Sequence, residues 1–199
     1  MMAKRFFDIV ASAAALVVLT PVIAAIAVWI ALDSRGPVFF RQNRVGRFGA
    51  EFRIYKFRTM VDGAEDRGPG LTIGNDARIT SSGEFLRRTK LDELPQLINV
   101  LKGEMSIVGP RPELPRYVRF YPPDVRERVL SVRPGITDEA SIEFADESEL
   151  LSRASDPDVE YVREILPRKL RLATEYIKTP TLLGDLRIIL RTIARIVRK

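Results

Sequence analysis

The sequence has no cysteine and no histidine among its 199 residues. The absence of cysteine excludes disulfide bonds, thiolate metal sites and a cysteine nucleophile. The absence of histidine removes the side chain that most often serves as a general base or metal ligand near neutral pH. Acid–base chemistry is therefore left to Asp, Glu, Lys or Tyr, and a bound metal would be a hard cation with oxygen ligands.

Internal repeats and low-complexity tracts are also missing, whereas 46% of the residues are hydrophobic and the formal net charge is +6. This length and hydrophobic content predict one compact domain with an appendage. The positive charge suits a phosphorylated substrate, an anionic membrane surface or nucleic acid. No nucleic-acid-binding motif or aromatic platform accompanies the charge, so we expect no nucleic acid partner.

Residues 9–32 form a run without a charged side chain. The run exceeds the roughly 20 apolar residues that a helix needs to cross a bilayer, and it is longer than the apolar region of a signal peptide. Lys4 and Arg5 precede it, and several arginines, beginning with Arg35, follow it. Because Lys and Arg favour the cytoplasmic side of a membrane, both ends of the run are expected on that side.

Thr20 and Pro21 lie in the middle of the apolar run. A helix that breaks at this proline, dips into the membrane and returns would satisfy both basic flanks. A kinked spanning helix and a cleaved signal peptide are the alternatives. The preferred interpretation divides the chain into a re-entrant helix-break-helix over residues 1–34 and a second domain over residues 35–199.

Residues 38–44 and 51–57 are predicted to form a β-hairpin around a turn at 46–49. Near the end of the second strand, Lys56 and Arg58 fit either a solvated sheet edge or a phosphate clamp. The rest of the chain predicts helices and therefore a mainly helical α+β fold. The expected helices cover residues 83–88 (capped by Ser82), 94–102, 115–121, 124–132, 158–178 (interrupted at Pro167) and 181–199, with an acidic helix or lid at 141–151.

Asp92 and Glu93 are adjacent carboxylates at the expected start of a helix, behind a run of basic residues. In the simplest interpretation Thr89 and Asp92 form a capping box, or Asp92 itself is the N-cap, and the helix ends at Gly103. In a second interpretation the pair binds phosphate and Mg²⁺ or supplies a nucleophile. Because neighbouring residues do not share a helix face, the two carboxylates would take different roles.

Two arginines are fixed by proline. Arg111 lies between Pro110 and Pro112, and Arg133 precedes Pro134. A rigid guanidinium suits a phosphate or a nucleotide base edge, whereas a surface turn with a nearby acid is the alternative. Residues 181–199 place an apolar stripe opposite a row of arginines, which indicates a membrane surface, a partner groove, or packing on the core with a solvated arginine face.

Seven stretches combine into a specific pattern. They are Lys4-Arg5-Phe6-Phe7-Asp8, Gln42-x-Arg44-x-Gly46-x-x-Gly49-x-x-Phe52, Lys56-Phe57-Arg58-Thr59-Met60, Asp76-x-Arg78-Ile79-Thr80, Asp92-Glu93-Leu94-Pro95-Gln96, Val108-Gly109-Pro110-Arg111-Pro112 and Pro134-Gly135-Ile136-Thr137. In content and order they resemble the bacterial sugar transferases called monotopic phosphoglycosyl transferases, in their small form.

The resemblance implies an activity and a location. Such enzymes move a phospho-sugar from a UDP-sugar to polyprenyl (undecaprenyl) phosphate and release UMP, as the first membrane step of glycoconjugate or exopolysaccharide assembly. It implies Mg²⁺ as cofactor, contact with membrane lipid, and a cytosolic catalytic domain with interfacial helices on the bacterial inner membrane. It also implies a re-entrant helix broken at a motif that matches Thr20-Pro21.

Residue roles follow from the same resemblance. Asp92 resembles the nucleophile that takes the phospho-sugar and contacts Mg²⁺, and Glu93 its acid/base partner. The substrate-binding candidates are Arg87 as a phosphate ligand, and Lys56, Arg58, Arg111 and Arg133 around the phosphates and nucleotide.

The chain departs from the family pattern after Thr137, where residues 138–144 replace a common Gly-Trp or Gly-Leu continuation, so the contacts to the donor sugar stay open. The alternative function is a non-catalytic membrane-bound adaptor that recognises anionic lipid. That alternative gives no reason for the adjacent carboxylates.

Overall fold

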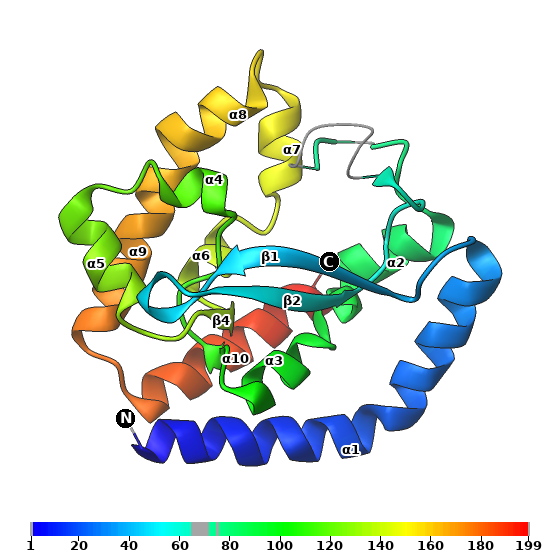
Figure 1. Ribbon diagram of the computed structural model, residues 1–199, viewed down its shortest axis with the longest axis horizontal. Coiled ribbons are helices and arrows are strands. Elements are labelled where there is room, and N and C mark those ends of the chain that lie inside the picture. Colours follow the sequence, from blue (N-terminus) through cyan, green and yellow to red (C-terminus); the bar gives the residue numbers. More distant parts are fainter. Residues whose placement is uncertain (1, 65–71, 75, 199) are drawn as a thin grey trace.

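The computed structural model describes residues 2–64, 72–74 and 76–198, and shows a long N-terminal helix beside a mainly helical domain with two small sheets (Figure 1). The predicted α+β class is confirmed. The helices are α1 (Met2–Asp33), α2 (Ser81–Thr89), α3 (Gln96–Lys102), α4 (Pro115–Val118), α5 (Pro123–Leu130), α6 (Glu139–Glu143), α7 (Glu147–Ser152), α8 (Pro157–Glu160), α9 (Leu166–Lys178) and α10 (Leu182–Val197). Short helical turns are η1 (Arg47–Gly49), η3 (Leu91–Glu93) and the π-helical η4 (Tyr161–Ile165). The strands are β1 (Phe39–Val45), β2 (Glu51–Phe57), β3 (Ser106–Val108) and β4 (Gly135–Thr137).

The antiparallel pairing of β1 with β2 confirms the predicted hairpin, with β1 shifted by one residue. Side chains on the two faces of β2 enter different parts of the core, as the alternation of a strand requires. Ile54 packs with Val100 and Met105, whereas Phe57 packs with Leu86 and the second half of α1. The hairpin therefore joins α3 to α1 and α2.

A second sheet, in which β3 and β4 pair in parallel, was not predicted from the sequence. Three-residue strands contain too little alternation to be recognised. A Cβ atom on Gly135 would lie 2.1 Å from the backbone nitrogen of Gly109, so only glycine allows the strands to approach this closely. This approach fixes the loop that follows β3.

The N-terminal end of α1 is tied to the globular domain by polar contacts. The Lys4 ammonium lies 2.5 Å from the Asp185 carboxylate of α10. Buried Asp8 accepts hydrogen bonds from the Ser106 hydroxyl (2.8 Å) and the backbone N–H of Ile107 (3.2 Å). The first turns of the apolar helix are therefore fixed to β3 and α10.

The C-terminal end of α1 is tied to the same domain. Buried Arg58 donates to the carbonyl oxygens of Ser34 (2.7 Å) and Pro37 (2.6 Å), just beyond the helix. The Asp33 carboxylate accepts from the backbone N–H and the hydroxyl of Ser82. Between these ends the helix continues through Pro21, and Figure 1 shows that its axis changes direction partway.

Several helix predictions need correction. Thr80, and not Ser82, caps α2, because its hydroxyl accepts from the backbone N–H of Gly83. The helix predicted at 158–178 is divided among α8, η4 and α9, and the π-helical turn ends at Ile165, two residues before Pro167. The segment at 141–151 forms parts of α6 and α7. Residues after Phe144 build the main core, where Leu151, Tyr161 and Leu166 pack with α4 and α5.

Candidate active site

A left-handed backbone at Lys90 (φ 58°) turns the chain between α2 and the adjacent carboxylates, which η3 carries into the interior. Asp92 and Glu93 are only 6% and 8% exposed. Within the described residues no side chain caps η3 or α3, and the Thr89 hydroxyl donates to Phe85 in its own helix. The capping interpretation is therefore wrong, and the burial of two carboxylates requires another explanation. The predicted helix end at Gly103 is confirmed.

Glu93 is held by two cations from different elements. The Lys56 ammonium, near the end of β2, lies 2.7 Å from Oε1. The Arg111 guanidinium donates to both oxygens, at 2.5 Å to Oε1 and 3.3 Å to Oε2. Burial raises the pKa of Glu93, but Arg111 and Lys56 outweigh burial and hold the pKa well below its usual range. Glu93 is therefore an ionised carboxylate.

Asp92 has a different environment. Its Oδ2 atom lies 3.7 Å from the Lys56 ammonium, and its buried Oδ1 atom has no hydrogen-bond partner among the described residues. Burial raises the pKa of Asp92, Lys56 opposes this shift, and the charge of Glu93 adds to it. Adjacent carboxylates whose pKa values move in opposite directions are typical of an active site that assigns them different roles.

Arg111 reaches Glu93 from the loop after β3. Its backbone N–H donates to the buried Asp138 carboxylate at 3.0 Å, and the same carboxylate caps α6 through the N–H of Ser141. The charge of Glu93 raises the pKa of Arg111, although burial lowers it. The hydrogen bond to Asp138 thus holds the backbone from which the Arg111 guanidinium reaches Glu93.

Arg87, in the last turn of α2, interacts electrostatically with Asp92. Its guanidinium donates to the hydroxyl groups of Thr59 and Thr72, both at 2.8 Å. Burial lowers the pKa of Arg87, while the charges of Asp92 and Asp76 raise it. Neutral hydroxyls leave the positive charge of Arg87 available to a phosphate ligand beside Asp92.

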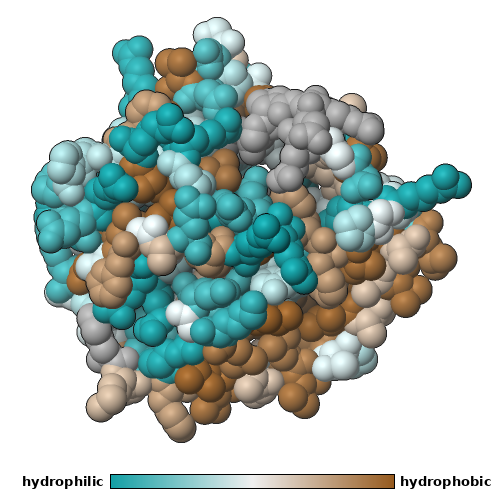
Figure 2. Space-filling view, in the orientation of Figure 1, coloured by the Kyte–Doolittle hydropathy of each residue, from teal (hydrophilic) through white to brown (hydrophobic). Residues whose placement is uncertain are grey.

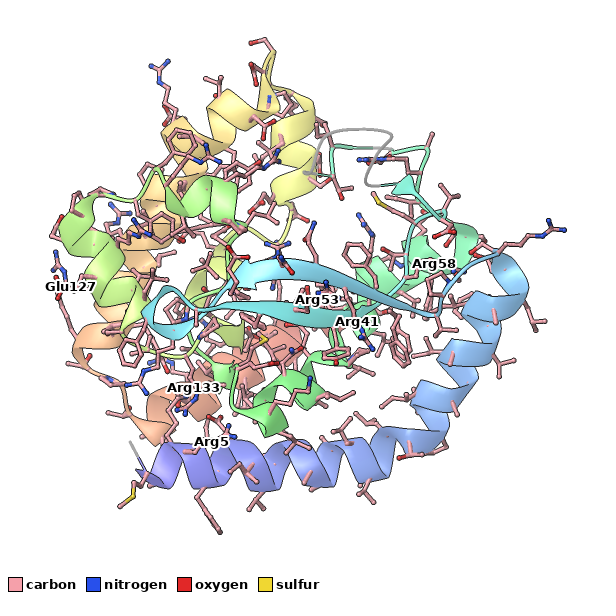
Figure 3. All side chains as sticks on the ribbon, in the orientation of Figure 1. Arg5, Arg41, Arg53, Arg58, Glu127 and Arg133 are labelled. Atoms are coloured by element: carbon pink, nitrogen blue, oxygen red, sulfur yellow. The ribbon has the colours of Figure 1, made fainter. Side chains whose placement is uncertain are left out.

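Two of the predicted substrate-binding residues lie elsewhere. Arg58 is directed to the end of α1, and Arg133 donates to the carbonyl oxygen of Gly103 at the far end of α3 (Figure 3). Thr20 and Pro21 lie within α1, where the Thr20 hydroxyl donates to the Leu16 carbonyl oxygen. The structure therefore gathers Lys56, Arg87 and Arg111 at the carboxylates, but not Arg58 or Arg133.

Two residues of this site were not singled out from the sequence. Lys90 interacts electrostatically with both Glu93 and Asp92, and its place in the basic run before the pair was the available signal. Asp138 orients Arg111, and its position where the chain departs from the family pattern gave no indication of this role.

The residues present fit Mg²⁺ only as an ion shared with a substrate. Among the described residues there is no group of three or more His, Cys, Asp or Glu side chains that would hold a metal alone. However, the buried Oδ1 atom of Asp92 is a hard oxygen without a partner. Mg²⁺ is commonly bound through one or two carboxylates together with substrate phosphates and water. Asp92 is therefore the residue that would hold it.

Comparison with known proteins identifies related sequences. The sequence model of the family described as bacterial sugar transferase matches residues 1–199. A UDP-glucose:undecaprenyl-phosphate glucose-1-phosphate transferase of Escherichia coli (strain K12) is 42% identical over 167 residues, which cover 81% of this chain and 36% of that protein. An enzyme of the same name from Caulobacter vibrioides is 37% identical, over 96% of this chain and 68% of that protein.

A third relative carries a different sugar in its name. The UDP-N-acetylgalactosamine-undecaprenyl-phosphate N-acetylgalactosaminephosphotransferase of Aeromonas hydrophila is 43% identical over 141 residues, which cover 70% of this chain and 33% of that protein. The chain thus spans about a third of the length of the Aeromonas and Escherichia proteins.

Proposed function

The chain belongs to the bacterial sugar transferase family, and from this membership we propose that it transfers a sugar 1-phosphate from a UDP-sugar to polyprenyl phosphate and releases UMP. The observation that carries the proposal is the pair of buried carboxylates with opposite pKa shifts, placed among cations that suit a diphosphate. The names of the relatives give a UDP-sugar, undecaprenyl phosphate and a sugar phosphate transfer for those proteins.

In the first step Asp92 attacks the phosphorus that carries the sugar. A bond forms between a carboxylate oxygen of Asp92 and this phosphorus, and the bond to the bridging oxygen breaks, so that UMP leaves. The positive charges of Arg87, Lys56 and Arg111 offset the charge that develops on the transferring group. Mg²⁺, when bound at Asp92, would supply further neutralisation of the diphosphate.

In the second step polyprenyl phosphate attacks the same phosphorus and expels the Asp92 carboxylate, which yields the polyprenyl diphosphate sugar. Glu93 is the residue placed to accept the proton of the incoming phosphate. Its low pKa requires that the substrate phosphates first compete for Lys56 and Arg111. The covalent intermediate predicts ping-pong kinetics.

The arrangement of α1 supports a re-entrant attachment to the cytoplasmic face of the bacterial inner membrane. The helix is long and apolar enough to cross a membrane, and only 11% of its most apolar 18-residue stretch is buried against the protein. Because both of its ends bond to the same domain, a middle part that enters the bilayer has to return. Figure 2 shows hydrophobic residues gathered along the lower edge of this face, over α1.

Helix α10 supports the same attachment through its apolar side chains. Leu183, Leu190 and Val197 are exposed along one face of the helix. The predicted row of arginines is partly engaged, because Arg191 pairs with Glu139 and Arg195 with Asp146. We therefore assign the apolar stripe, and not the whole arginine row, to the membrane surface.

The test is UMP release by detergent-solubilised protein with Mg²⁺, polyprenyl phosphate and a panel of UDP-sugars. We expect release with one donor, and a covalent phospho-sugar adduct that disappears in Asp92→Asn. The matched control is Asp124→Asn, which removes an exposed carboxylate from α5. A covalent phospho-sugar adduct on Asp92→Asn would refute the assignment of Asp92 as the nucleophile. Folded protein that binds anionic vesicles but turns over no donor would support the adaptor alternative.

A further inference from the structure

We propose that Arg5, Arg47 and Arg133 form a binding site for the phosphate of an anionic phospholipid headgroup, an inference that rests on the proposed membrane attachment. The three residues come from α1, η1 and the turn before β4. Arg5 donates to two carbonyl oxygens in the last turn of α3, and Arg133 donates to that of Gly103 directly after it. Arg47 donates to the Ser131 carbonyl oxygen at 2.8 Å. Figure 3 shows Arg5 and Arg133 near one another.

Arg47 and Arg133 have unused N–H donors, and no carboxylate is paired with any of the three arginines in the described part of the chain, although the Arg47 guanidinium lies over the Phe48 ring, 4.3 Å from its centroid. Arg47 and Arg133 each donate only through Nε, so within the described residues the terminal amino groups of both lack a hydrogen-bond partner. Among the same residues no carboxylate forms a salt bridge with any of the three arginines. The charge of Asp8 raises the pKa of Arg133, but the carboxylate oxygens of Asp8 accept their hydrogen bonds from the Ser106 hydroxyl and the Ile107 backbone N–H. Burial lowers the pKa of Arg133, and the charges of Arg5 and Arg47 lower it further. A bound phosphate would relieve this repulsion.

The apolar surroundings favour a lipid phosphate over a soluble one. At the same end of α1, Met2 and Phe6 are 89% and 71% exposed. Leu183 of α10 is 79% exposed, and the Lys4–Asp185 ion pair joins α10 to this end of α1. A headgroup on the arginines would therefore have apolar side chains beside its acyl chains.

The site is separate from the catalytic pair. Asp92 and Glu93 precede the N-terminus of α3, whereas Arg5 and Arg133 bind carbonyl oxygens at its C-terminus. A helix of seven residues is about 10 Å long, so one phosphate does not reach both places. The arginines would orient the domain on the membrane without contact to the reacting atoms.

The experiment compares thermal unfolding of the full chain in neutral detergent micelles that contain phosphatidylglycerol or phosphatidylcholine. A ligand that binds the folded state raises its unfolding midpoint. We expect phosphatidylglycerol to raise the midpoint of the unmodified protein above its value with phosphatidylcholine. Arg47→Gln should reduce this rise, and Arg47→Gln with Arg133→Gln should abolish it. Arg153→Gln, which removes an exposed arginine from the end of α7, should retain it.

The same rise in the double variant, an equal loss in Arg153→Gln, or an equal rise with inorganic phosphate alone would each overturn the proposal. The midpoint in phosphatidylcholine shows whether a variant folds. If the double variant does not fold, the test compares the rise in the unfolding midpoint between Arg47→Gln and Arg47→Lys. Only the Lys variant keeps the charge, so the rise should be larger in Arg47→Lys than in Arg47→Gln. UMP release is measured separately, so a protein without turnover that keeps the phosphatidylglycerol effect would refute the proposed reaction and not this site.

Discussion

Replacing Arg58 with Gln is expected to reduce fold stability and to leave substrate affinity unchanged. The buried guanidinium makes two short hydrogen bonds to carbonyl oxygens that follow α1. A hydrogen bond from a charged group contributes about 1.5–3 kcal/mol, so losing both costs about 3 kcal/mol at the lower limit. For a chain of this length each kcal/mol corresponds to about 2–4 °C, and the unfolding midpoint should fall by about 6–12 °C.

The assay pairs thermal unfolding in neutral detergent with the KM for the UDP-sugar, measured well below the lower midpoint. Arg53→Gln is the matched control, because Arg53 is an exposed arginine on β2, the strand that directly precedes Arg58. Arg58→Lys keeps the charge but not the planar fork, so its midpoint should lie between those of the Gln variant and the unmodified protein. An unchanged unfolding midpoint together with a raised KM would indicate that Arg58 binds the substrate and would refute this reasoning.

Three further predictions concern Glu93 and α1. Because the folded-state pKa of Glu93 is lowered, the stability that its ionised form contributes is complete above the usual Glu pKa of about 4.3 and is lost as the pH falls below that value. The free energy of unfolding lost in Arg111→Met should accordingly be largest near neutral pH and shrink on acidification. A loss that does not depend on pH would contradict this. Asp8→Ala leaves the backbone N–H of Ile107 unpaired, at a cost of about 1–3 kcal/mol, while the Ser106 hydroxyl keeps the Val108 carbonyl oxygen as acceptor. Hydrogen exchange in the first turns of α1 should therefore accelerate, whereas unchanged protection there would show that the Asp8 bonds do not hold the helix. Pro21→Ala tests whether the proline, and not the contacts at both ends of α1, drives the return: with a proline-driven return, cysteines introduced by Ala3→Cys and Arg35→Cys should label from opposite sides of the membrane in this variant. Continued labelling from one side would count against a proline-driven return and assign it to the end contacts.

Local patterns predicted the elements that local physics determines. The hairpin followed from two strand-like segments around a glycine turn, and the end of α3 followed from Gly103, which adopts φ 85°. The pairing of β3 with β4 depends on a contact between Gly109 and Gly135, which lie far apart in the sequence. No periodicity within three residues carries that information.

The errors at the site have the same origin. Thr89 and Asp92 have capping-box spacing, but the left-handed conformation of Lys90 turns Asp92 away from that position. Lys56 and Arg58 would share a face if the strand continued; because β2 ends at Phe57, Lys56 contacts Glu93 while Arg58 contacts the end of α1. Neither outcome was accessible without knowing which distant elements pack there.

The cations that hold Glu93 also explain how one site could separate two chemical steps. Without substrate, Lys56 and Arg111 neutralise Glu93 and keep its proton affinity low, so Asp92 is the carboxylate whose oxygen remains without a partner. A diphosphate that enters would compete with Glu93 for Lys56 and Arg111, because the same N–H donors that bind a carboxylate also bind phosphate oxygens. As that competition weakens the hold on Glu93, its pKa would return toward the usual range. Substrate binding would thereby supply the base for the second step only after the donor for the first step is in place.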